Sequence, residues 1–196
     1  MIRMSTYKNH SKMVMLGYSY LGGVTMRLNI ILRFISIFFL LTLSACTNDE
    51  VKYDGEPLKI AVVGDTPELN NEKIHFESIS LDEFSEDTVH ISTTFDAVMI
   101  TPVVFEEASN DRFVEVYTNC KTPIIFFDST KRHFPFTRGG ATYETAHWES
   151  LNNGSHTTIY LADRDADRED AWYFYLKDEK DLDSLYKEVF QMVETL

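Results

Sequence analysis

The chain of 196 residues has few cysteines, few glycines and fewer basic than acidic residues. Its two cysteines, Cys46 and Cys120, allow at most one disulfide, so a folded domain must be stabilised mainly by its apolar core. Its eight glycines form no Gly-x-Gly-x-x-Gly or Walker pattern, which argues against a nucleotide or nicotinamide enzyme. The formal net charge of −13 repels phosphate backbones, so nucleic acid is not an expected partner.

The apolar run at residues 34–43 is too short to cross a bilayer. It has no charged residue, but it is about half as long as the roughly 20 residues of a spanning helix. It follows Arg27 and Arg33 and precedes the small residues Ser44 and Ala45. A basic region, a short apolar region and a small-residue cleavage site form the layout of an export signal, which we favour over a transmembrane helix.

The residues Leu43-Ser44-Ala45-Cys46 resemble the lipobox of bacterial lipoproteins. The resemblance implies that Cys46 receives a diacylglycerol anchor on its sulfur and becomes the first residue of the mature chain. It also implies a location on the extracytoplasmic face of the cell membrane. With Cys46 modified, Cys120 has no partner for an intramolecular disulfide.

The signal divides the chain into parts of different composition. Met26 makes a better start for a signal of ordinary size than Met1. The expected parts are an upstream extension or misassigned start at 1–25, a signal peptide at 26–45, a tether at 46–56 and an extracytoplasmic domain at 57–196. All 31 acidic residues follow Cys46, against 13 of the 18 basic ones, so the exported part carries a net charge of −18.

Apolar runs in the exported part predict an α/β domain. Short runs bounded by turn residues suit buried strands, expected at 58–63, 74–79, 88–92, 95–100 and 124–127. A helical stretch begins at Thr101-Pro102, with a break near Ser109-Asn110. A strand, a helix and a strand of these lengths form a right-handed parallel unit.

The C-terminal third predicts two antiparallel strands and a helix. The strands are expected at 157–162 and 171–177, and an amphipathic helix at 181–196. The whole predicts a single Rossmann-like or flavodoxin-like three-layer domain with a mainly parallel sheet and an antiparallel C-terminal hairpin. Residues 95–131 resemble small, functionally uncharacterised lipoproteins of Gram-positive bacteria, and this resemblance implies no activity.

Polar residues at the strand ends form the first candidate site. Ligands of open parallel sheets bind beyond the carboxyl ends of the strands. Asp65, Thr101, Asp128 and Ser129 are expected on that edge, where they would hold a cation or a small polar ligand. The same residue types are also ordinary turn and capping residues at such junctions.

The long segment 130–153 forms the second candidate site. It concentrates basic and aromatic residues in an acidic protein, among them Arg132, His133, Phe134, Arg138 and Trp148. We expect it to bind an anionic ligand or a partner of the cell envelope, unless its aromatic residues only cover the end of a small core. The histidines of this region lack the spacing of a zinc site, so no metal or cofactor is predicted.

The sequence leaves three functions open. The preferred one is a lipid-anchored domain that binds a ligand or partner without catalysis. The alternative is a cation-dependent cell-surface enzyme that uses Asp65 or Asp128. The third is a structural spacer in the cell envelope.

Overall fold

The computed structural model describes residues 52–163 and 166–196. The predictions for 1–25, for the signal peptide at 26–45 and for Cys46 lie outside these ranges. Within them, no helix combines the length and the apolar character that a membrane crossing requires.

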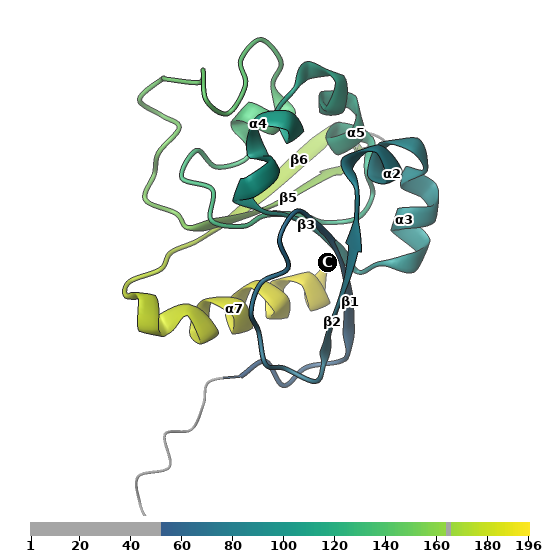
Figure 1. Ribbon diagram of the computed structural model, residues 1–196, viewed down its shortest axis with the longest axis vertical. Coiled ribbons are helices and arrows are strands. Elements are labelled where there is room, and N and C mark those ends of the chain that lie inside the picture. The colour runs from purple at the N-terminus through teal and green to yellow at the C-terminus, as the bar shows by residue number, and fades with distance from the viewer. Residues whose placement is uncertain (1–51, 164–165) are drawn as a thin grey trace, which may run out of the picture. The chain divides into compact units, whose positions relative to one another are not determined.

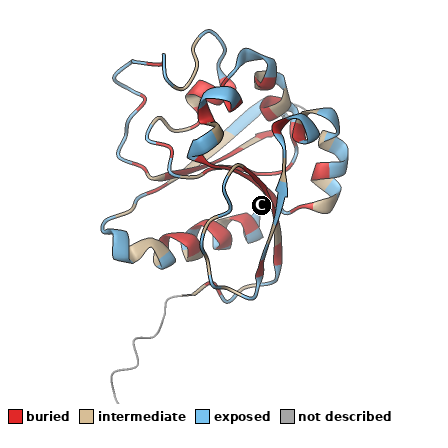
Figure 2. Cartoon of the chain, in the orientation of Figure 1, coloured by how far each residue is buried: buried red, intermediate tan, exposed pale blue. Residues whose placement is uncertain are grey.

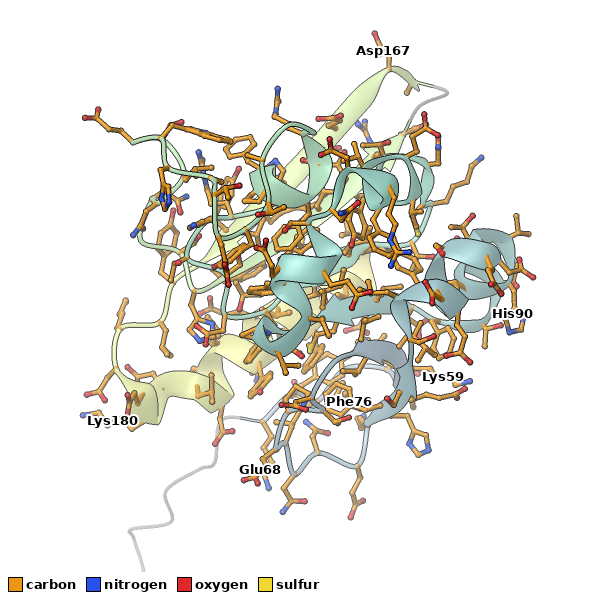
Figure 3. All side chains as sticks on the ribbon, turned by 45° about the horizontal axis from the view of Figure 1, so that its top comes forward. Lys59, Glu68, Phe76, His90, Asp167 and Lys180 are labelled. Carbon is orange, nitrogen blue, oxygen red and sulfur yellow. The ribbon has the colours of Figure 1, made fainter. Side chains whose placement is uncertain are left out.

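The described chain forms a six-stranded mixed sheet in the order β2-β1-β3-β4-β5-β6. Four strands run parallel: β1 (Leu58–Val63), β2 (Ile74–Ile79), β3 (Ala97–Ile100) and β4 (Ile124–Phe126). Two antiparallel strands, β5 (Thr157–Asp163) and β6 (Arg168–Phe174), extend the sheet beyond β4. The mainly parallel sheet with an antiparallel C-terminal hairpin is therefore confirmed. Asp167 marks the tip of that hairpin in Figure 3.

Helices cover both faces of the sheet, which gives three layers (Figure 1). The first face carries α2 (Leu81–Glu86), α3 (Thr88–Thr94), η1 (Pro102–Val104), α4 (Phe105–Ala108), η2 (Asp111–Phe113), α5 (Val114–Asn119) and α6 (Phe134–Thr137). The second face carries α7 (Leu182–Thr195), which follows the short η4 (Glu179–Asp181). The α/β class and its three-layer arrangement are as predicted.

Alternate residues of the central strands build two separate cores. In β1, Ala61 and Val63 pack under the short helices, whereas Ile60 and Val62 pack under α7. The predicted amphipathic face of α7 is confirmed, because its apolar side is buried on the sheet and its other side is exposed (Figure 2). The last apolar residue of that pattern, Leu196, is 46% exposed.

The strand predicted at 88–92 is wrong, because these residues belong to α3. The Asp87 side chain accepts a hydrogen bond from the His90 amide at 2.8 Å and begins the helix. Only Ile91 of this short helix is buried. The capping hydrogen bond of Asp87 therefore favours a helix at residues whose β-branched side chains alone would favour a strand.

The segment just before β1 is docked on the domain, although the sequence assigns it to the tether. Tyr53 is buried, and its hydroxyl donates to the Glu56 carbonyl at 2.7 Å, with Glu194 Oε2 at 3.1 Å. The Glu56 amide donates to Glu194 Oε1 at 3.1 Å. Residues 53–56 thus join the start of β1 to the end of α7.

Candidate functional site

A small crevice opens where the connections after β1 and β3 diverge. Leu69, in the connection after β1, packs on the α7 face, whereas Phe105, after β3, packs on the opposite face. This is the point of the sheet where the strand order reverses, and open α/β sheets bind ligands there. The crevice has a volume of about 280 Å³ and is lined by Asp65, Thr66, Pro67, Thr101, Pro102, Val103 and Phe127.

A glycine allows the two connections to approach closely. Gly64 has a φ of +105°, and a Cβ atom there would lie 2.3 Å from Thr101 Oγ1. The Thr101 amide donates to the Val63 carbonyl at 3.1 Å, and its hydroxyl approaches the same oxygen at 3.4 Å. These contacts hold the base of the crevice in one shape.

Phe127 forms the far wall of the crevice at the end of β4. Its ring stacks on Tyr186 of α7, with centroids 5.4 Å apart and planes 8° apart. The His156 ring meets Phe127 edge-on at 5.1 Å. The wall is therefore supported by α7 from one side and by the start of β5 from another.

Asp128, the residue after Phe127, faces a histidine that the sequence did not single out as a site residue. His156 Nε2 lies 3.4 Å from Asp128 Oδ1, and Nδ1 lies 2.9 Å from the hydroxyl of Thr157. A neutral ring protonated on Nε2 would face the carboxylate with a donor and would accept from the Thr157 hydroxyl at Nδ1. Burial lowers the pKa of His156, while the Asp128 carboxylate acts in the opposite direction.

The strand-end residues predicted from the sequence divide into two groups. Asp65 and Thr101 line the crevice, and Asp128 directly follows its wall residue Phe127. Ser129 is fully buried, and its hydroxyl donates to the Arg132 carbonyl at 2.8 Å, so it stabilises a turn. Over 52–163 and 166–196, no group of three or more His, Cys, Asp or Glu side chains is placed to hold a metal ion.

The basic residues predicted to bind a ligand in the segment 130–153 mostly contact that segment itself. Arg132 donates to the carbonyls of Ser150 and Leu151, and its guanidinium lies 4.3 Å from the Phe134 ring centre. Arg138 is exposed and covers the same ring at 5.3 Å. Arg132 thus closes the segment on itself.

Trp148 and His133 of the same segment have opposite environments. Trp148 is 44% exposed, whereas His133 is buried and stacks on Tyr160 with ring centres 5.2 Å apart. His133 Nδ1 is buried, and no hydrogen-bond partner for it occurs among residues 52–163 and 166–196. Burial, together with the positive charges of Arg132 and Arg138, lowers the pKa of His133 from 6.5 to about 4.

No family model, curated protein or solved structure matches this chain.

We expect Gly64→Ala to destabilise the domain more than Gly140→Ala. Both glycines have positive φ, which costs an alanine about 1–2 kcal/mol, but a Cβ at Gly140 meets nothing within 4 Å. The additional clash with Thr101 should make the loss of unfolding free energy larger for Gly64→Ala, as measured by urea unfolding. Equal losses would mean that the two connections are not in close contact.

We expect His133 to make stability depend on pH. Its folded pKa of about 4 lies below its unfolded value near 6.5, so the unfolded state binds the proton first. The contribution of His133 to the unfolding free energy is fully present above pH 6.5. It is lost, by about 3 kcal/mol in total, as the pH falls from 6.5 through 4. His133→Phe should remove this part of the slope in unfolding experiments between pH 7 and 4. His147→Gln, at an exposed position, should keep it.

Proposed function

We propose that this chain is a lipid-anchored extracytoplasmic protein whose domain binds a small ligand in the crevice between the β1 and β3 connections. The anchor is the diacylglycerol group expected at Cys46. The observation that carries the binding proposal is the crevice itself, with hydroxyl and carboxylate groups beside apolar walls at the point where strand order reverses.

Several features favour binding over catalysis at this crevice. His156 contacts the crevice wall at Phe127, and both of its ring nitrogens face protein groups. A general base needs a nitrogen within reach of the substrate proton. Thr101 is buried, and its hydroxyl donates to the carbonyl of Val63 at the end of β1. The hydroxyl is therefore oriented by the backbone and is not paired with a base that could make it a nucleophile.

The contacts of the segment 130–153 give weaker support to a partner-binding site there than the crevice gives to a ligand-binding site. A cationic docking surface needs guanidinium groups that are free to pair with a partner's carboxylates. Arg132 already donates to two carbonyls of the segment, and the Phe134 ring lies under both Arg132 and Arg138. Trp148 is the exposed aromatic residue left for a contact with an envelope protein.

The anchor is tested by replacing the cysteine in cells that produce the full chain. Cys46→Ala should abolish incorporation of an alkyne-tagged palmitate and release the protein from the membrane fraction. Cys120→Ala is the matched control, because its thiol is buried and its pKa is raised by burial. Retention of both label and membrane association by Cys46→Ala would refute the anchor.

Ligand binding is tested by titrating the ¹⁵N-labelled full chain with 1-butanol. The backbone amide signals of Asp65, Thr66 and Val103 should shift in a saturable way, because these residues line the crevice. Val103→Trp should abolish these shifts by filling the space. Val89→Trp, at an exposed position of α3, should leave them unchanged. Shifts that do not saturate, or that persist in Val103→Trp, would contradict the proposal.

A further inference from the structure

We infer that the outer edge of β6 is a docking surface for an extended segment of another protein, which adds a strand to the sheet and carries basic residues at the end that lies beside Asp167 and Glu169. This surface is separate from the crevice between the β1 and β3 connections. Its occupancy does not depend on a ligand in the crevice.

The backbone edge of β6 is open to a further strand. β6 is the last strand of the sheet, and its neighbour in the sheet is β5. An edge strand presents a row of N–H and C=O groups that its single neighbour cannot pair. Among residues 52–163 and 166–196, no hydrogen bond joins the backbone of residues 168–173 to a group outside the β5–β6 pair. Sheets with such an edge bind extended peptides through main-chain hydrogen bonds.

The residues of this edge favour strand pairing. Residues 171–176, Ala-Trp-Tyr-Phe-Tyr-Leu, contain no charged residue, proline or glycine, and aromatic residues are enriched in strands. Proteins commonly prevent pairing at an edge with charges along it. In β2, at the opposite end of the sheet, the exposed His75 and Glu77 interrupt the strand. In β6 the charges are confined to residues 168–170.

Side chains on both faces hold this edge in place. Trp172 packs against the core under α7. Tyr173 points to the opposite face, where the Arg132 guanidinium lies 5.3 Å from its ring centre and the His133 ring lies 6.2 Å away. The strand is therefore ordered before a partner arrives, which reduces the ordering cost of binding.

The end of β6 at the hairpin tip is acidic. Residues 163–170 contain five acidic residues and two arginines. Asp167, at the outer end of the hairpin in Figure 3, and Glu169 line a hollow of about 560 Å³ together with Arg168. Arg168 Nε is paired with Asp170 Oδ2 at 2.7 Å, whereas Asp167 and Glu169 are exposed carboxylates. A lysine or arginine of an added strand would meet a negative potential there.

A second copy of this chain fits the edge less well than a basic segment does. The chain has a net charge of −13, so two copies repel each other. If two copies of β6 paired antiparallel over residues 168–174, Glu169 would lie opposite Tyr173 and Asp170 opposite Trp172 of the other copy. Those carboxylates would lose water without gaining a cation, which is unfavourable. The occupant is therefore a basic partner and not this chain.

The test titrates three peptides into the ¹⁵N-labelled full chain at pH 7.5. The cationic peptide is acetyl-Thr-Val-Thr-Val-Thr-Lys-Thr-Lys-amide, whose C-terminal lysines would lie beside Asp167 in an antiparallel pair because β6 begins there. The acidic peptide has glutamate in place of both lysines. The third is the cationic peptide with N-methyl groups on its first five residues, which keeps the charge but removes the hydrogen-bond donors.

We expect only the cationic peptide with free amides to bind. It should shift the amide signals of residues 168–174 in a saturable way and slow hydrogen exchange of those amides that face away from β5. The acidic peptide should be repelled, and the N-methylated peptide should be unable to form the ladder. Adding 0.5 M NaCl should weaken the binding of the cationic peptide, because salt screens the exposed charges.

Two variants assign the charge preference to the acidic end of β6. Glu169→Gln should weaken the cationic peptide about two- to fivefold, the range for an exposed charge pair. Glu77→Gln removes an exposed carboxylate from β2 and is the matched control, so it should bind the peptide like the parent chain. Unchanged thermal melting of both variants excludes unfolding as the cause of any loss.

Four outcomes would overturn the inference. The N-methylated peptide may bind as tightly as the cationic one, the signals of β2 may shift in place of those of β6, or no peptide may bind. Concentration-dependent shifts of residues 168–174 without peptide would show that a second copy occupies the edge. None of these results bears on the crevice, whose amides are followed separately in the 1-butanol titration.

Discussion

The parallel pairing of β1 with β3 is the constraint on which the site depends. Both strands are buried on both faces, so their side chains belong to two cores at once. Because strand order reverses at this pair, the chain after β1 passes to the α7 face and the chain after β3 passes to the other. The crevice is the space that this divergence leaves, and the side chains around it only determine what fits.

The sequence predicts this framework well because the strands and the C-terminal helix each show a local pattern of apolar and polar residues. Apolar runs closed by turn residues locate β1, β3 and β4, and the helical periodicity at the C-terminus locates α7. It fails at 88–92, where Asp87 begins a helix among residues that favour strands. Nor does it show that Tyr53 docks on the domain, because its partner Glu194 lies 141 positions away.

The site is predictable only in part. The rule of strand ends finds Asp65 and Thr101 without knowledge of the pairing. His156 requires the register of β4 against β5: Phe126 is opposite Thr158, and continuing this register brings His156 to Asp128. Arg132 requires the closure of the segment 130–153, which places its guanidinium on carbonyls 18 and 19 residues further along. Such contacts leave no local signal in the sequence.

The docking of Tyr53 determines at which edge of the sheet the domain would be attached to a bilayer. On the proposed anchor, six residues separate Cys46 from Tyr53, a span of at most about 25 Å. Tyr53 and Glu56 lie at the amino ends of the parallel strands, and the crevice lies at their carboxyl ends. If the proposed anchor is present, the chain would therefore enter the domain at the edge of the sheet opposite the crevice.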